Sequence, residues 1–189
     1  FAGHGRSCQW ASRDYRFAGP PCYPLRMSQL QLRAADGHTF SAYLAKPEGS
    51  IRGGVVVVQE IFGVTGHIER VADQYASKGY LAIAPALFDR QQRGVNLPYD
   101  DTGVKTGFSY AQQADTAGLM ADLNAAVDAV AHAGAVGMVG YCWGGRVVYM
   151  AGSRTNIAAG VVYYGGGITQ VLEPAPRCPM QFHFGRHDS

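Results

Sequence analysis

The sequence has no long apolar run, little net charge and few cysteines. Nowhere in its 189 residues does an apolar stretch approach the roughly 20 residues that a membrane-spanning helix needs. The formal net charge is only +2, without the basic stripe that is typical of nucleic-acid-binding proteins. The 4 cysteines match no zinc template and do not indicate a disulfide framework. We therefore expect no membrane and no nucleic-acid partner, and the cysteine usage indicates a reduced, cytoplasmic protein.

Residues 1–26 differ from the rest of the chain. They hold four arginines against one acid, show neither strand nor helix periodicity, and lack the apolar core of a secretory signal. Met27 follows directly. We interpret 1–26 as a non-native or disordered extension, with an Arg-rich transit peptide as the alternative, and 27–189 as one domain.

Strand-like and helix-like segments alternate after Met27. The four valines of Val55–Val58 indicate a strand buried on both faces, as in a parallel sheet. This alternation predicts an α/β fold with a mainly parallel, doubly wound sheet and flanking helices. In chain order we expect a hairpin over 30–44, strands over 55–58, 80–84, 135–139, 157–163 and 180–184, and helices over 66–78, 110–132 and 143–153, with a loop-rich stretch over 86–108.

Cys142 is the strongest candidate for a catalytic residue. It is centred in Gly140–Gly145 (GYCWGG), between a predicted strand and a predicted helix, which is the context of a G-x-nucleophile-x-G elbow. The head of the helix favours negative charge and should lower the pKa of the thiol. The amide of Trp143 would point to where an oxyanion forms. The alternative is a buried structural cysteine in a Gly-rich turn.

Two carboxylates follow other predicted strands. Glu60 comes directly after Val55–Val58 and Gln59, at the sheet edge where ligands bind in open α/β sheets. A glutamate beside a thiol could accept its proton, and the amide of Ile61 could be a second oxyanion donor. Asp188 follows a late strand, where enzymes with a G-x-nucleophile-x-G elbow carry the acid of their catalytic triad. The alternatives are a solvated strand-end acid for Glu60 and a turn aspartate for Asp188.

Four segments together resemble the dienelactone hydrolase (carboxymethylenebutenolidase) family of the α/β-hydrolase superfamily. The segments are QEIFGV at 59–64, APALFDR at 84–90, GYCWGG at 140–145 and HFGRHD at 183–188, and the similarity covers about residues 28–189. The resemblance implies an α/β-hydrolase fold, here lacking its last strand and helix, and a monomer when full length. It implies no metal and no organic cofactor.

The resemblance also implies the roles of individual residues. Cys142 and Asp188 would belong to a Cys–His–Asp triad, and Glu60 would contact the thiol and help to generate the thiolate. The amides of Ile61 and Trp143 would form the oxyanion hole. The implied reaction opens dienelactone to maleylacetate, a step of aromatic degradation, through an acyl-enzyme on the cysteine.

Arg90 matches the family arginine that meets the substrate carboxylate. A planar guanidinium binds a carboxylate through two parallel hydrogen bonds, which suits this role. The alternative is a surface arginine in a mobile loop. The preceding residues Pro85–Asp89 depart from the usual family pattern, so the substrate preference of this loop stays open.

The triad histidine is expected after Asp188 in chain order, beyond Ser189. We expect structural or surface roles for His38, His67, His183 and His187. Two alternatives therefore stay open beside the lactone hydrolase. The first is another carboxylesterase or a thioesterase on the same scaffold, and the second is an inactive fragment that lacks the triad histidine.

Overall fold

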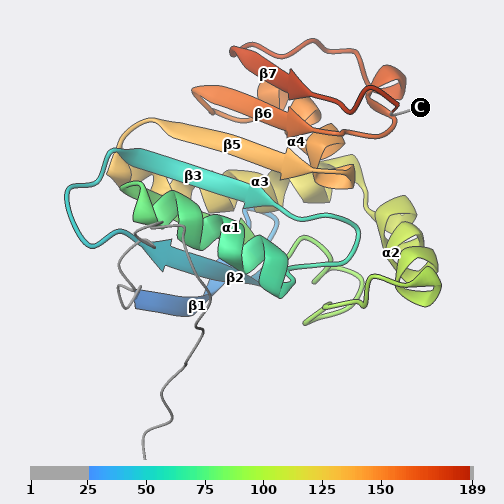
Figure 1. Ribbon diagram of the computed structural model, residues 1–189, viewed down its shortest axis with the longest axis horizontal. Coiled ribbons are helices and arrows are strands. Elements are labelled where there is room, and N and C mark those ends of the chain that lie inside the picture. The colour runs from blue at the N-terminus through green and yellow to red at the C-terminus, as the bar shows by residue number, and fades with distance from the viewer. Residues whose placement is uncertain (1–25, 188–189) are drawn as a thin grey trace, which may run out of the picture.

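A mixed, mostly parallel sheet of 7 strands forms the centre of the computed structural model, which describes residues 26–187 (Figure 1). The strands are β1 (Arg26–Arg33), β2 (Thr39–Lys46), β3 (Gly53–Val58), β4 (Tyr80–Pro85), β5 (Val136–Tyr141), β6 (Ala159–Tyr163) and β7 (Met180–His183). The helices are α1 (Gly66–Ser77), α2 (Asp101–Gln113), α3 (Thr116–Val130) and α4 (Trp143–Arg154), with short 3-10 turns at Ala131–Ala133 and Ile168–Gln170. The extension expected over 1–26 lies outside the described residues, except for Arg26 at the start of β1, and so does Asp188.

The strand order is β1-β2-β4-β3-β5-β6-β7. β1 and β2 form an antiparallel hairpin, and β2 also pairs antiparallel with β4. All later neighbours are parallel. The predicted α/β class and the predicted hairpin are therefore confirmed. Because β3, β5 and β6 run side by side in one direction, the residues that follow them gather at one edge of the sheet.

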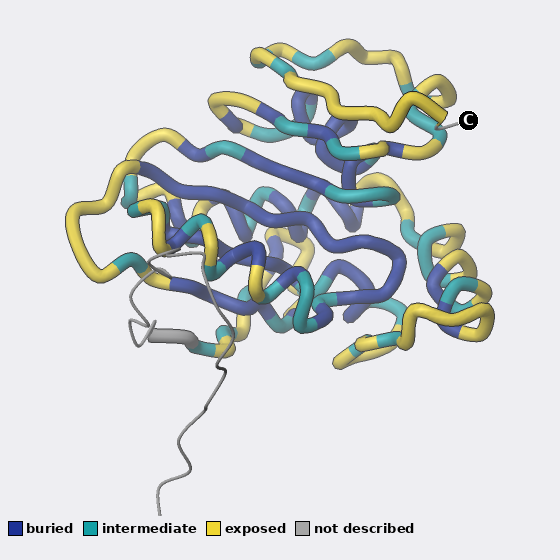
Figure 2. The backbone as a smooth tube through the Cα atoms, in the orientation of Figure 1, coloured by how far each residue is buried: buried dark blue, intermediate teal, exposed yellow. Residues whose placement is uncertain are grey.

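The core lies on both faces of the sheet, and β3 contributes to each. Val55 and Val57 pack with α1 on one face, whereas Val56 and Val58 pack with α3 and α4 on the other. All six residues of β3 are buried, and Figure 2 shows the same for the centre of the sheet. The predicted two-sided burial of the valine run is confirmed.

The region 86–132 differs from the prediction. α2 occupies part of the stretch expected to be a loop, and the single helix expected over 110–132 is two helices, α2 and α3. Asp115 causes the break, because its carboxylate accepts hydrogen bonds from the N–H groups of Ala117 (2.8 Å) and Gly118 (3.2 Å) and so begins a new helix. No helix in residues 26–187 is long and apolar enough to cross a membrane.

Candidate active site

Cys142 lies in a sharp turn between strand and helix. β5 ends at Tyr141 and α4 begins at Trp143, so the cysteine alone joins them. Its φ and ψ are 53° and −122°, a strained conformation of the kind that is concentrated at functional sites. The Cys142 N–H donates to the Tyr163 carbonyl oxygen at 3.0 Å, which ties the turn to β6. The predicted strand–turn–helix context of Cys142 is confirmed.

Gly140 lets the turn close tightly. A Cβ on Gly140 would lie 2.2 Å from the carbonyl oxygen of Gly144, far inside van der Waals contact. Gly140 also pairs in register with Val58 of the neighbouring parallel strand β3. Glu60 lies two residues past Val58, and Cys142 lies two residues past Gly140. Because Val58 and Gly140 are paired, Glu60 and Cys142 lie at the same edge of the sheet.

The Cys142 thiol is half-buried. Burial raises its pKa, the hydrogen bond from the Trp143 backbone lowers it, and the negative charge of Glu60 raises it. The net direction is upward, so the expectation of a lowered thiol pKa at the head of a helix is wrong for this structure, because desolvation outweighs the helix terminus. A thiol of this kind is protonated near neutral pH and needs a base before it can act as a nucleophile.

Glu60 is enclosed, with only 8% of its surface exposed. The Tyr99 hydroxyl donates a hydrogen bond to its Oε2 at 2.9 Å, and the Tyr164 hydroxyl donates to its Oε1 at 3.4 Å. Glu60 is therefore not a solvated strand-end acid. Both of its oxygens have a donor, and its charge acts on the thiol of Cys142.

Tyr99 and Tyr164 are site residues that the sequence did not point to. Burial, in the main, raises the pKa of both hydroxyls, and Glu60 raises it further, so both remain protonated donors at neutral pH. Tyr164 directly follows β6, which is a weak signal for the functional edge of the sheet. Its φ of 40° is unusual for a residue with a side chain and has no counterpart in the sequence pattern.

Ile61 is buried at the start of the segment that turns away from β3. The Leu97 N–H donates to the Phe62 carbonyl oxygen at 2.9 Å, and Gly63 forms an isolated bridge with Asn96. The segment that precedes α2 therefore fixes the backbone of residues 61–63 from outside. This support is needed if the Ile61 amide is to serve as an oxyanion donor, a role that stays a prediction.

Trp143, the second expected oxyanion donor, has its ring packed into an aromatic cluster. Its ring centroid lies 4.9 Å from that of Phe88, and Phe88 lies 5.6 Å from Tyr110 of α2. The side chain thus anchors the first turn of α4 to the segment after β4. Its backbone hydrogen bond toward Cys142 agrees with an amide that faces the nucleophile.

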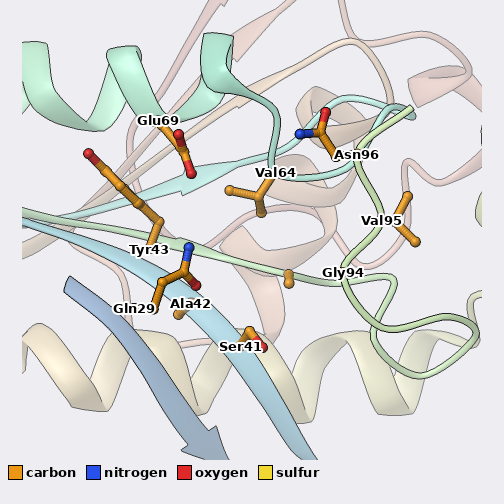
Figure 3. A pocket seen from close by; sticks show the side chains of 10 residues that line it. Gln29, Ser41, Ala42, Tyr43, Val64, Glu69, Gly94, Val95 and Asn96 are labelled. Atoms are coloured by element: carbon orange, nitrogen blue, oxygen red, sulfur yellow. The ribbon is translucent and has the colours of Figure 1, made fainter. Parts of the chain in front are cut away.

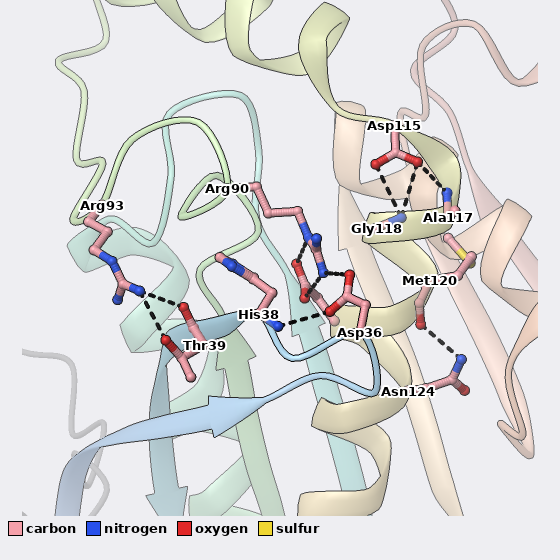
Figure 4. Close-up of polar contacts among 11 residues, drawn as sticks. Asp36, His38, Thr39, Arg90, Arg93, Asp115, Ala117, Gly118, Met120 and Asn124 are labelled. Carbon is pink, nitrogen blue, oxygen red and sulfur yellow. Dashed lines mark hydrogen bonds and ion pairs between the residues drawn. The ribbon is translucent and has the colours of Figure 1, made fainter.

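Arg90 is held by two carboxylates (Figure 4). Its Nε and Nη2 donate to the two oxygens of Asp122 at 2.8 Å each, and Nη2 lies 2.8 Å from Oδ2 of Asp36. Asp122 is fully buried in α3, where burial raises its pKa and Arg90 opposes the shift. Arg90 is therefore not the loose surface arginine of the alternative. Its expected contact with a substrate carboxylate stays a prediction, and a contact through two parallel hydrogen bonds would require Nε or Nη2 to exchange a partner.

The described histidines near the sheet pack on aromatic rings. His183 stacks on Tyr163 with ring centroids 4.5 Å apart, and His67 meets Tyr141 edge-on at 6.0 Å. His38 stacks on Phe40. These contacts agree with the structural roles expected for them. Asp188, the predicted triad acid, lies outside the described residues.

A cavity of about 240 Å³ lies beside the segment that supports Ile61 (Figure 3). It is lined by residues of β1, β2 and α1, of the segment between β3 and α1, and of the stretch between β4 and α2, namely Gln29, Ser41, Ala42, Tyr43, Val64, Glu69, Ala86, Gly94, Val95 and Asn96. Neither Cys142 nor Glu60 lines it, so the cavity is separate from the candidate nucleophile. Within residues 26–187, no group of three or more His, Cys, Asp or Glu side chains could hold a metal ion.

Comparison with protein families agrees with this geometry. Residues 40–189 match the model of the Dienelactone hydrolase family. The carboxymethylenebutenolidase of Pseudomonas putida is 32% identical over 166 residues, which cover 84% of this chain and 70% of that protein. Carboxymethylenebutenolidase 1 of Cupriavidus pinatubonensis is 31% identical over 170 residues, covering 84% of this chain and 71% of that one.

Solved structures show the same fold. A Klebsiella pneumoniae structure assigned as a dienelactone hydrolase aligns with a TM-score of 0.65 and 31% identity, covering 76% of this chain and 61% of that chain. A cold-adapted esterase from an Arctic intertidal metagenomic library aligns with a TM-score of 0.63 at 22% identity, covering 94% and 77%. The chain thus has the α/β-hydrolase fold and spans 61% of the length of the Klebsiella structure.

Proposed function

Because this chain belongs to the dienelactone hydrolase family, a family of hydrolases that act on esters and lactones, we propose that it opens a carboxylate-bearing lactone, dienelactone to maleylacetate, through an acyl-enzyme on Cys142. The observation that carries the proposal is the strained turn of Cys142 at the same sheet edge as the enclosed Glu60. A nucleophile presented on such a turn, with a carboxylate close enough to act on its charge, is suited to acyl transfer.

The chemistry proceeds in two steps. The sulfur of Cys142 attacks the lactone carbonyl carbon, and the carbonyl oxygen becomes an oxyanion that accepts hydrogen bonds from the amides of Ile61 and Trp143. Collapse of this intermediate breaks the ring C–O bond, and the leaving oxygen takes up a proton. Water then attacks the thioester, which releases the new carboxylate and restores the thiol.

We assign Glu60 as the base that takes the proton of the Cys142 thiol. The resting thiol has a raised pKa, so it becomes a nucleophile only when a base takes its proton as substrate binds. We assign Asp188 the role of orienting a histidine, which the family pattern puts after this acid in chain order and which carries protons in both steps.

A simpler ester or a thioester is the second candidate substrate class. The observation that favours it is the ion pairing of Arg90, whose guanidinium is bound on two sides by Asp122 and Asp36. An arginine with these partners offers fewer free donors to a substrate carboxylate than the resemblance implies.

Acylation of the protein tests the reaction without requiring turnover. The protein is mixed with dienelactone, with p-nitrophenyl acetate or with a thioester, quenched in acid, and digested, and the mass of the Cys142 peptide is measured. We expect an acyl adduct on Cys142 that forms fastest with dienelactone, and no adduct on this peptide in Cys142→Ala. Steady-state hydrolysis is measured in parallel.

The outcomes separate the candidates. Faster acylation by the plain ester or the thioester would favour the second substrate class. Acylation without turnover would identify a chain that carries the nucleophile but does not complete hydrolysis. Hydrolysis of dienelactone by Cys142→Ala at the rate of the unchanged protein would overturn the cysteine mechanism.

A further inference from the structure

Tyr99 reaches Glu60 from a segment that is far away in sequence. It directly precedes Asp100, the residue that caps α2 by accepting a hydrogen bond from the Gly103 N–H at 2.8 Å. The same segment is held against residues 62 and 63 by the Leu97–Phe62 hydrogen bond and the Asn96–Gly63 bridge. The position of the Tyr99 hydroxyl is therefore set by the backbone that also supports the expected oxyanion hole.

The hydrogen bonds around the Tyr99 hydroxyl have one consistent direction. Its oxygen lies 2.9 Å from Oε2 of Glu60 and 3.2 Å from Oγ1 of Thr65. A tyrosine has a single hydroxyl proton, and an ionised carboxylate can only accept. Tyr99 therefore donates to Glu60, and Thr65, which is buried, donates to Tyr99.

The rest of the Tyr99 side chain is fixed by packing although 58% of the residue is exposed. Its ring centroid lies 4.2 Å from that of Phe62, with an angle of 35° between the ring planes. The two rings therefore pack directly against each other, which fixes the orientation of the Tyr99 ring. The exposed tyrosine is thus held at both ends, by the ring of Phe62 and by the carboxylate of Glu60.

These contacts give Tyr99 a role at the nucleophile. We propose that Tyr99 is a positioning residue, whose hydroxyl holds the Glu60 carboxylate in place and disperses part of its charge, and thereby sets how readily the Cys142 thiol ionises. Tyr164 contributes in the same way through a longer hydrogen bond, 3.4 Å against 2.9 Å. The inference rests on the proposed function, because it concerns the acid–base state of the same nucleophile.

The test is the pH dependence of Cys142 alkylation by iodoacetamide. The rate is measured by peptide mass spectrometry, so that reaction at Cys178 and at the other cysteines is counted separately. In Tyr99→Phe the carboxylate loses its nearest donor and acts on the thiolate with more of its charge. We expect the alkylation midpoint of Cys142 to rise by about half a pH unit. Tyr164→Phe should raise it less.

Two further variants show that Tyr99 acts through Glu60. In Glu60→Gln the midpoint should fall, and adding Tyr99→Phe to Glu60→Gln should then change nothing. Tyr149→Phe is the matched control, because it also removes a hydrogen-bonded hydroxyl, one that donates to the Leu172 carbonyl oxygen at 3.1 Å. This control should keep the midpoint of the unchanged protein, and thermal melting verifies that each variant is folded.

An unchanged midpoint in folded Tyr99→Phe would overturn the inference, and so would a shift of equal size in the Glu60→Gln background. Should Tyr99→Phe fail to fold, Thr65→Val replaces it, since this variant removes the donor to Tyr99 and should raise the midpoint in the same direction. The titration of the thiol needs no substrate. A failure of the inference about Tyr99 is therefore distinguishable from a failure of the lactone-opening proposal.

Discussion

Gly144 of α4 stands directly against the backbone of Gln59, so closely that a Cβ on Gly144 would lie 2.3 Å from the Gln59 carbonyl oxygen. This approach joins the first turn of the helix after Cys142 to the end of β3, the strand that leads to Glu60. The segments that carry the candidate nucleophile Cys142 and Glu60 are therefore joined by backbone contact.

Gly144→Ala should separate these two segments. The added methyl group meets a backbone oxygen that has no rotamer by which to move away, and overpacking of this kind costs about 1–3 kcal/mol. We expect a lower free energy of unfolding in urea and at least a tenfold slower acylation of Cys142, since a displaced nucleophile loses its alignment.

Gly137→Ala is the matched control for this substitution. Gly137 lies in β5, the strand before the same turn, but the nearest atom to an added Cβ is 3.8 Å away, an ordinary contact. It should keep both the stability and the acylation rate. Equal losses in the two variants would mean that the Gly144–Gln59 contact has no special role.

The raised pKa of Cys142 predicts how stability changes with pH. A group whose pKa is higher in the folded than in the unfolded state contributes stability that is present below its unfolded pKa and is lost as the pH rises. The cysteine thiol of an unfolded chain has a pKa of about 8.5. We therefore expect the melting temperature to fall above about pH 8.5, and to fall less steeply in Cys142→Ala.

Cys178 also has a raised pKa, so the measurement is best made in a Cys178→Ala background. The tyrosines with raised pKa values titrate at higher pH. Between pH 8.5 and about 10, the change in melting temperature therefore reports the ionisation of the Cys142 thiol. A slope unaffected by Cys142→Ala would contradict the burial of this thiol as the cause.

Arg90→Met should destabilise the fold strongly. It removes the one hydrogen-bonding partner that residues 26–187 provide for the Asp122 carboxylate, which is fully buried in α3. Breaking a buried pair by removing one partner typically costs about 3–5 kcal/mol. Urea unfolding at neutral pH measures the loss.

Asp36→Asn serves as the comparison. Asp36 meets the same guanidinium but is exposed, so its loss should cost far less stability than the loss of Arg90. The double variant Arg90→Met/Asp122→Leu should recover most of the stability, since no unpaired charge remains buried. If the double variant is as unstable as Arg90→Met, the cost comes from lost packing around Arg90 instead.

The sequence predicted the parts of the fold that depend on local pattern. Val55–Val58 was correctly predicted to be buried on both faces, because a run of β-branched residues suits such a strand. The strand–turn–helix context of Cys142 was predicted for a similar reason, since the glycines and the flanking periodicity are adjacent in sequence.

α2 was missed because its buried positions carry no large apolar side chain. Its buried residues are Gly103 and Gly107, and their use is visible only in three dimensions. A Cβ on Gly107 would lie 2.2 Å from the Ile61 carbonyl oxygen, so the glycine permits close packing of the helix on the segment after β3. Sequence periodicity detects a helix by its large apolar side chains. It does not detect close packing that depends on glycines, which have no side chain.

The site was predicted only in part for a related reason. Cys142 stands directly after β5 and Glu60 stands two residues after the end of β3, where the edge of a parallel sheet makes polar residues conspicuous. Tyr99 and the ion pair between Arg90 and Asp122 depend on segments that are 39 and 32 residues apart in sequence. No local pattern specifies such pairs.

The indole of Trp143 has a consequence for spectroscopy. It is next in sequence to the candidate nucleophile and packs on Phe88, so we expect its emission to change when the neighbouring sulfur ionises or is acylated. The other tryptophan, Trp10, lies outside the described residues, and Trp10→Phe would leave Trp143 as the single tryptophan. Stopped-flow fluorescence of that variant would follow events at the nucleophile in real time, with a reporter that the chain itself supplies.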